Sequence, residues 1–279
     1  MLSEILKICR KYNIRLSPKL SQHFLHSPNI IESEIKYADI QKSDIVLDIG
    51  AGFGFLTGRL AEKAKKVYAI EIDKKMISVL RERLSRFIDS DKVIIIEGDV
   101  LSIDLPKDVN KIVSNPPFHI ISPLIFRIAE TYFDSEQFDV CVMIVQHDYA
   151  NKMKARPGEK RSRLSATIQY FADIEILMQI SRRNFFPIPK VDAALIRIKP
   201  SRRKHIVDFV TFKKVVTLLF SMPNKILRKI IKKTFSRDTA NKIILELQQA
   251  GIRPEVRLRD LTNNELELLA NILKKYLTP

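Results

Sequence analysis

Short apolar segments rich in β-branched residues alternate with segments of helical spacing over the first half of the chain. The segments DIVLDIG, KVYAIEID, KVIIIEGDV, KIVSN and VCVMIVQHD predict strands, and FLTGRLAEKA and KKMISVLRERLSRFI predict helices. Strands that alternate with helices are typical of a mostly parallel sheet covered on both faces. We therefore predict a doubly wound, Rossmann-like α/β fold, which IEILMQIS and DAALIRIKP extend as an antiparallel edge.

The pattern changes after Pro200. The segment SRRKH is polar and basic, as expected of a linker, and everything beyond it has helical spacing. The last helix, within LTNNELELLANILKKYL, opens with a capping box from Thr262 to Glu265. We place a domain boundary near residue 203, which gives an α/β domain over residues 1–203 and a small all-helical domain over residues 204–279.

The net charge of +16 over 279 residues indicates a polyanionic partner, and residues 201–279 contribute +10 of it. The alternative is a solvated lysine-rich surface of the kind found in thermophile proteins.

Cys9 and Cys141 lie far apart, which predicts neither a disulfide nor a metal site and fits the cytoplasm. No apolar run approaches a membrane span, so we expect no membrane partner. The basic, amphipathic residues 1–20 leave a transit peptide as a minor alternative.

Four of the seven glycines lie between residues 50 and 58, directly after the first strand. Such a concentration indicates that the backbone approaches a ligand closely. The dinucleotide fingerprint requires glycines at relative positions one, three and six, and counting from Gly50 or Gly52 places Phe55 or Thr57 at position six. This spacing disfavours NAD.

Acidic residues follow the same strands. Asp48 precedes the glycine turn, Glu71 ends the second strand, where a carboxylate can bind both hydroxyls of a ribose, and Asp99 ends the third strand, where it can accept from an adenine amino group. This pattern suits a nucleoside with a cationic tail, which predicts S-adenosylmethionine as the cofactor. The alternative is a tight turn with solvent-facing carboxylates.

The segment Asn115-Pro116-Pro117-Phe118 ends the fourth strand, at the edge where a ligand crevice is expected. Proline lacks an N–H, so this turn is stiff and free of ladder pairing. The Asn115 side-chain oxygen and the Pro116 carbonyl offer two acceptors, which suit the exocyclic amino group of adenine. Phe118 offers a ring for stacking the base. The alternative is a structural proline turn capped by Asn115.

These motifs resemble the ribosomal RNA adenine dimethyltransferase family. The resemblance covers nearly the whole chain, through SQHFL, VLDIGAGFGFLT, AIEID, EGDVL, NPPFHIISP, RPGEKRSRLS and NFFPIPKVDAALIRI. It implies a class I S-adenosylmethionine methyltransferase domain followed by a helical RNA-binding domain. It also implies two methyl transfers to each of two adjacent adenosines near the 3′ end of small-subunit ribosomal RNA, within an immature subunit. We expect the enzyme to be a monomer.

The resemblance assigns roles to individual residues. Residues 1–30 are expected to contact cofactor or RNA, and the target base is expected near Asn115, Pro116, Phe118 and Phe185. The expected cofactor contacts are His23, Leu25, Gly50, Glu71, Asp99 and Asn115. This chain departs from the usual family pattern in having histidine at position 23, proline at 116, phenylalanine at 118 and alanine at 193.

Two basic segments are candidate RNA contacts. Within PNKILRKIIKK the cations recur at helical spacing and define one face of a helix, opposite four apolar residues. The cations are Lys225, Arg228, Lys229, Lys232 and Lys233. The segment KMKARPGEKRSR, residues 152–163, is expected to be a mobile loop that either contacts phosphate or is simply solvated. The histidines show no metal spacing, so no metal is expected.

Two other functions remain open on the sequence. One is a non-catalytic RNA-binding protein that assists ribosome assembly and retains the fold. The other keeps the chemistry but acts on large-subunit ribosomal RNA or DNA, because target choice depends on loops and shape rather than on a local motif.

Overall fold

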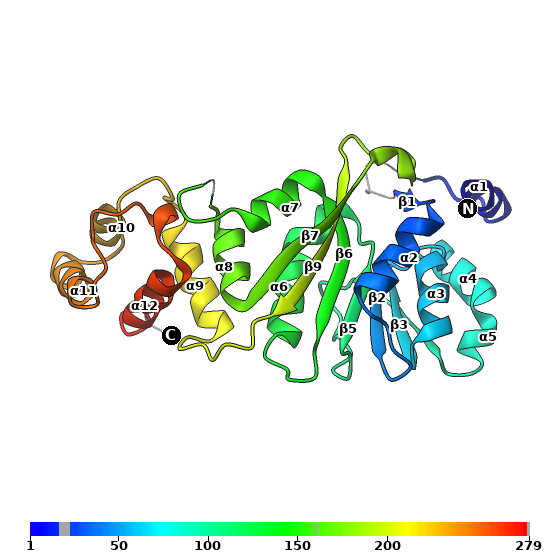
Figure 1. Ribbon diagram of the computed structural model, residues 1–279, viewed down its shortest axis with the longest axis horizontal. Coiled ribbons are helices and arrows are strands. Elements are labelled where there is room, and N and C mark those ends of the chain that lie inside the picture. The colour runs from blue at the N-terminus through cyan, green and yellow to red at the C-terminus, as the bar shows by residue number, and fades with distance from the viewer. Residues whose placement is uncertain (17–22, 160, 278–279) are drawn as a thin grey trace. The chain divides into compact units, whose positions relative to one another are not determined.

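A seven-stranded mixed sheet organises the first part of the chain in the computed structural model, which describes residues 1–16, 23–159 and 161–277 (Figure 1). Ser21 and Gln22 of the SQHFL motif lie outside the described residues. The sheet order is β4-β3-β2-β5-β6-β9-β7. The strands are β2 (Ile45–Ile49), β3 (Lys66–Glu71), β4 (Val93–Glu97), β5 (Lys111–Ser114), β6 (Val140–Gln146), β7 (Ala172–Ile180) and β9 (Ala193–Pro200).

The sheet confirms the predicted fold class. Strands β2 to β6 pair in parallel, and β9 pairs antiparallel to β6, so the late strand pair forms the expected edge. All four residues of β5 are buried, as are six of the seven in β6, because helices cover both faces of a parallel sheet.

Helices flank the strands as the spacing predicts, with one difference. The helices of this part are α1 (Leu2–Lys11), α2 (Pro28–Tyr37), α3 (Phe55–Lys63), α4 (Lys74–Arg83), α5 (Ser85–Ile88), α6 (Ile121–Tyr132) and α7 (His147–Lys154). The helix predicted over 74–88 is divided at Leu84, which has φ −106° and ψ 13°. The Leu84 side chain is buried close to Gly54 and Gly58, which leave room for it.

A small two-stranded sheet joins two distant segments of the chain. Strand β1 (Phe24–Leu25) pairs antiparallel with β8 (Phe185–Phe186), so Phe24 and Leu25 lie beside the NFFP motif. Two short 3-10 helices also belong to this part of the chain, η2 (Phe118–Ile120) and η3 (Arg182–Asn184).

The described residues form two compact units. The first contains residues 1–150 and 174–200, and the second contains residues 151–173 and 201–279. The second unit holds α8 (Arg163–Phe171), α9 (Phe209–Leu219), α10 (Leu227–Thr234), α11 (Arg237–Gln249), η4 (Leu258–Asp260) and α12 (Asn263–Leu273). The predicted capping box of α12 is confirmed, since Thr262 and Glu265 bond reciprocally.

Residues 151–173 differ from the prediction, which placed them in the first domain and made 152–163 a mobile loop. Arg161 is only 3% exposed, and its guanidinium donates to the Leu261 carbonyl and the Asn263 side chain. The Asn263 amide in turn donates to the Gln169 carbonyl at 3.0 Å. A buried arginine needs such acceptors, so these bonds bind the segment to the C-terminal helices. Among the described residues, no helix is long and apolar enough to cross a bilayer.

Candidate functional site

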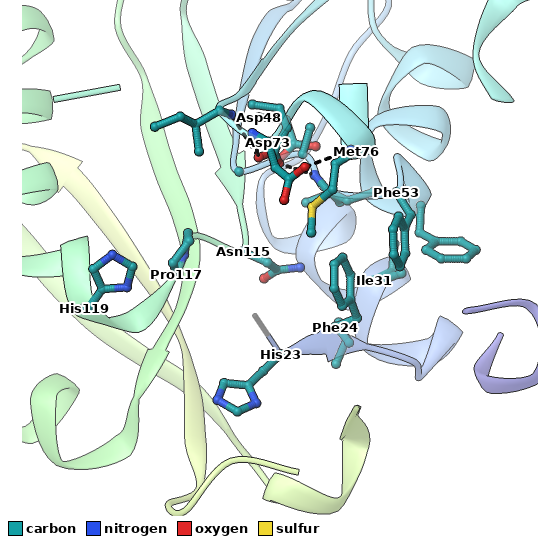
Figure 2. Close-up of a pocket in the computed structure, with 18 residues that line it drawn as sticks. His23, Phe24, Ile31, Asp48, Phe53, Asp73, Met76, Asn115, Pro117 and His119 are labelled. Atoms are coloured by element: carbon teal, nitrogen blue, oxygen red, sulfur yellow. Dashed lines mark hydrogen bonds between the residues drawn. The ribbon is translucent and has the colours of Figure 1, made fainter. Parts of the chain in front are cut away.

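A cavity of about 430 Å³ lies in the first unit, where β2, β3 and β5 end (Figure 2). Strand β1, the glycine loop after β2, the end of β3 and the turn after β5 all line it. The carboxyl ends of parallel strands meet at one edge of a sheet, which is where ligands bind in open α/β folds. The sequence placed Asp48, Glu71 and Asn115 at these same strand ends.

The glycine loop follows the narrow path that the sequence predicts. The amides of Gly50 and Ala51 both donate to the Ile70 carbonyl, which fixes the start of the loop. Gly50 has φ +72°, and a Cβ there would lie 3.1 Å from Pro117 Cδ. Gly52 has φ +56°, and a Cβ there would lie 2.7 Å from the Phe24 ring. Only glycine lets this backbone take left-handed angles while segments on both sides approach it closely.

The Glu71 carboxylate is held on the cavity wall by three backbone bonds. Gly52 N donates to Oε2 at 2.8 Å, and the amides of Ile72 and Asp73 donate to Oε1 at 2.9 and 3.0 Å. The residue is only 6% exposed, and this burial raises the pKa of Glu71 while the backbone donors lower it. A carboxylate has about four acceptor sites. Glu71 therefore keeps capacity for a ligand hydroxyl.

A second acidic side chain, Asp48, lies beneath the same loop. Thr57 Oγ1 donates to its carboxyl group at 2.7 Å. Burial raises the pKa of Asp48 to about 7, with a further contribution from the charge of Glu71. Two acidic groups in one apolar wall repel each other and favour a cationic ligand. The sulfonium and ammonium groups of S-adenosylmethionine fit this wall.

Asn115 follows β5 and presents an amide to the cavity (Figure 2). Its Nδ2 donates to Glu34 Oε2 at 3.2 Å, whereas its Oδ1 is buried and has no hydrogen-bond partner among the described residues. Ser114 Oγ donates to the Ile49 carbonyl at 3.0 Å and so ties the turn to β2. A buried acceptor without a partner is costly, so Asn115 Oδ1 is ready to accept from a ligand.

The structure gathers some of the predicted site residues at the cavity and leaves others outside its wall. The lining includes His23, Leu25, Gly50, Glu71 and Asn115. It does not include Asp99, Pro116, Phe118 or Phe185.

Asp99 is exposed, and its carboxylate accepts from its own neighbour Leu101 N at 2.9 Å. The His23 ring contacts the Pro187 carbonyl through Nδ1 at 2.7 Å, so its side chain is turned toward the loop after β8. The expected cofactor contacts at Asp99 and His23 stay predictions.

The aromatic residues lie beside the cavity. The Phe118 ring is half-buried, with its centroid 6.1 Å from that of His23 and 6.4 Å from that of Phe185. Phe185 is 2% exposed and presents its ring edge-on to Phe118. Phe118 therefore keeps part of its ring accessible in the turn that begins with Asn115, whereas the Phe185 ring is buried.

The cationic helix face predicted for residues 225–233 is shorter in the structure. Helix α10 begins at Leu227, so Lys225 and Ile226 precede it, and the first amides of the helix donate to the carbonyls of Pro254 and Val256. Arg228 lies 2.7 Å from Glu255 in an ion pair. Lys229, Lys232 and Lys233 are exposed, opposite the buried residues Leu227, Ile230 and Ile231.

Sequence reasoning missed one residue that lines the cavity, Ile72, and one that does not line it but bonds the Asn115 amide, Glu34. Glu34 occupies a position on α2 that its neighbours Ile30, Ile31 and Ile35 mark as a core face, and this out-of-place carboxyl was the signal. Ile72 is 64% exposed although it is large and apolar, and it lines the cavity beside Glu71. An apolar side chain there suits one face of a flat base.

Comparisons with known proteins agree with the site. The model of the family described as ribosomal RNA adenine dimethylase matches residues 13–275. A probable ribosomal RNA small subunit methyltransferase A from Methanococcoides burtonii is 37% identical over 96% of this chain and 97% of its own length. The corresponding protein of Pyrococcus abyssi is 37% identical over 80% of this chain and 78% of its own.

A solved structure is similar over most of the chain. The dimethyladenosine transferase from Plasmodium falciparum superposes with a TM-score of 0.80 at 27% identity, covering 90% of this chain and 98% of that one. The fold, the glycine loop with its acidic wall, and the extent of the sequence match all lead to one assignment. This chain belongs to the ribosomal RNA adenine dimethylase family.

Proposed function

We propose that this chain transfers methyl groups from S-adenosylmethionine to the exocyclic amino group of adenosines in small-subunit ribosomal RNA. The observation that carries the proposal is the free, buried Oδ1 of Asn115 on the wall of a cavity built for a cationic nucleoside. The names of the relatives support a small-subunit target. By the family resemblance, the products are two adjacent dimethyladenosines near the 3′ end.

The roles proposed for Asn115 and Pro116 would account for how the amine becomes reactive. The lone pair of an adenine amino group is delocalised into the ring, which makes it a poor nucleophile. Asn115 Oδ1 and the Pro116 carbonyl accept its two N–H bonds and favour tetrahedral geometry, which localises the lone pair on nitrogen. When bound, S-adenosylmethionine supplies an electrophilic methyl group on a cationic sulfur. The amine proton leaves to water once the nitrogen is methylated, so no buried base is required.

The cofactor fits the residues that line the cavity. Glu71 would accept from a ribose hydroxyl, Ile72 would cover the adenine ring, and the glycine loop would leave room for the methionine chain. The acidic wall would stabilise the positive charge of the cofactor. The direct test is methyl transfer from labelled S-adenosylmethionine to RNA, because an assembly factor that only retains the fold would bind RNA without transferring label.

Phe118 is the expected stacking platform for the target adenine. Replacing it by alanine should raise the KM for RNA about 5- to 150-fold, which corresponds to the roughly 1–3 kcal/mol of one base–aromatic stack. Phe118→Tyr keeps the ring and should retain most of the affinity. Steady-state kinetics at saturating cofactor measure both variants. Equal KM values for the alanine and tyrosine variants would show that the ring does not contact the base.

The exposed lysines of α10 are the expected phosphate contacts of the helical unit. Changing Lys229, Lys232 and Lys233 to glutamine should weaken RNA binding and lower the log–log salt slope by roughly 2 units, at about 0.7 per phosphate contact on single strands. Lys225 and the paired Arg228 should contribute less. The measurement is RNA affinity over a series of salt concentrations.

A matched control for this experiment lies in the first unit. Lys36, Lys42 and Lys65 are exposed and stand near the amino ends of the strands, away from the cavity. Their replacement by glutamine removes the same charge. If both triple variants change the salt slope equally, the effect comes from net charge, and α10 is not a specific RNA contact.

We further propose that the enzyme acts as a monomer in the cytoplasm, on an immature small subunit rather than on naked RNA. The basic second unit supports contact with a folded, phosphate-rich particle. Comparing methyl transfer to naked RNA and to immature subunits tests the choice of substrate. Action on large-subunit ribosomal RNA or on DNA would appear as label in those molecules instead.

A further inference from the structure

Glu34 places a carboxyl group at a buried core position, where an apolar side chain is expected. It lies on α2 between Ile31 and Ile35, on the face that packs inward, and it is 0% exposed. Burying a carboxyl is unfavourable unless hydrogen bonds compensate it. A leucine or methionine would fill the same volume without that cost, so packing alone does not account for Glu34.

The hydrogen bonds of Glu34 lead to the catalytic turn. Its Oε2 accepts from Asn115 Nδ2 at 3.2 Å, and its Oε1 has no hydrogen-bond partner among the described residues. Burial raises the pKa of Glu34 well above its usual range, and the charge of Asp48 adds to the effect. In its neutral form the carboxyl carries one O–H donor and one carbonyl acceptor. Because Oε2 accepts from Asn115 Nδ2, the proton of the neutral form belongs on Oε1.

This contact decides which end of the Asn115 amide faces the ligand. An amide has a donor end and an acceptor end, and rotation about its last bond exchanges them. Only the acceptor end can bind the N–H of an adenine amino group, whereas the donor end would repel it. Because Glu34 holds Nδ2, Oδ1 is left free in the position where the amine is expected.

We infer that Glu34 is a positioning residue for methyl transfer, which fixes the Asn115 amide with its oxygen toward the target amine. The inference rests on the proposed role of Asn115 in contacting that amine. Without the acceptor at position 34, the Asn115 amide would sample both orientations, and part of the enzyme would present the wrong end. The consequence is a slower chemical step with little change in the binding of either substrate.

The test compares Glu34→Met, which removes the acceptor at similar volume, with Glu34→Gln, which keeps a carbonyl oxygen for Asn115 Nδ2. Single-turnover methyl transfer at saturating cofactor and RNA should fall about tenfold to a hundredfold in Glu34→Met, the range for losing a group that orients a reacting residue. Glu34→Gln should restore most of the rate. The melting temperature of Glu34→Met should stay the same or rise, because an unfavourable buried carboxyl is gone.

A control on the same helix is Glu32→Met, since Glu32 is exposed and pairs with Arg59 and Lys63. It should retain the wild-type rate. If Glu34→Met lowers the melting temperature and weakens both substrates without a specific loss of rate, Glu34 is a structural residue and the inference is overturned. A Glu34→Gln variant as slow as Glu34→Met would also overturn it.

Asn115→Ala separates this inference from the proposed function. If Asn115→Ala keeps the wild-type rate, the role of Asn115 is wrong, and the inference about Glu34 falls with it. If Asn115→Ala is slow while Glu34→Met is fast, only the inference about Glu34 fails. If Glu34 acts through Asn115, adding Glu34→Met to the Asn115→Ala variant should cause no further loss, whereas multiplied losses would show an independent role.

Discussion

Asn115→Ala is expected to reduce single-turnover methyl transfer by about a hundredfold or more, by analogy with the loss of one preorganised polar partner of a transition state elsewhere. Asn115 Oδ1 is a buried side-chain oxygen of the Asn-Pro-Pro-Phe turn that has no hydrogen-bond partner among the described residues. Removing it leaves the amine with the Pro116 carbonyl alone. Saturating cofactor and RNA separate this loss of chemistry from any loss of binding.

The fold and RNA binding of the Asn115 variant should persist, because the turn is tied to β2 by Ser114 rather than by Asn115. Gln41→Ala is a suitable control, since Gln41 is an exposed amide side chain that precedes β2 in the same unit and lies outside residues 1–30. It should behave as wild type. A near-normal single-turnover rate for Asn115→Ala would mean that the turn is structural and that the catalytic assignment is wrong.

Glu71→Ala is expected to weaken S-adenosylmethionine binding by about 1.5–3 kcal/mol, the range for a lost hydrogen bond to a charged group. The change removes the proposed ribose acceptor. It also releases Gly52 N, which donates to Glu71 Oε2 at 2.8 Å, so the glycine loop loses one of its restraints. Both effects lower affinity in the same direction, and titration calorimetry measures their sum.

Glu97→Ala is the matched control for Glu71. Glu97 ends the neighbouring strand β4 in register with Glu71, yet it is exposed and does not line the cavity. Its loss should leave cofactor affinity unchanged. Equal affinities for the two variants would remove the ribose assignment of Glu71.

The strands and the cofactor edge could be predicted from the sequence because both follow local rules. Buried parallel strands are continuous apolar segments, and β2 to β6 lie within the segments that this pattern marked. A cluster of glycines has few explanations other than close backbone approach, and Gly50 and Gly52 show that approach to Pro117 and Phe24. The place of Glu71 on the cavity wall could be predicted because the residue ends its strand.

The remaining features depend on contacts between distant residues, which spacing alone does not encode. The helical spacing of the cations includes Lys225, but helix α10 begins only at Leu227. There the amide of Leu227 donates to the Val256 carbonyl and the amide of Arg228 donates to the Pro254 carbonyl. Arg161 looked like part of a solvated loop because its acceptors lie a hundred residues later in the chain, at Leu261 and Asn263.

Glu34 is a residue of the site whose role also depends on a contact that spacing along the sequence does not encode. Its position among isoleucines is visible in the sequence, but its partner Asn115 lies 81 residues away. Asp99 illustrates the reverse case, since its place at the end of a strand predicted a ligand contact, whereas its carboxylate bonds its own turn. Strand ends show which residues can reach a ligand, and tertiary contacts decide which of them do.

The most direct test of the account is to map methylated adenines after immature small ribosomal subunits are incubated with this protein and S-adenosylmethionine. We expect dimethyladenosine at two adjacent positions near the 3′ end of the small-subunit RNA, and about a hundredfold less when Asn115→Ala replaces the wild-type chain over the same short incubation. Finding no methylated adenine with the wild-type protein, or finding it in large-subunit RNA or DNA instead, would contradict the account.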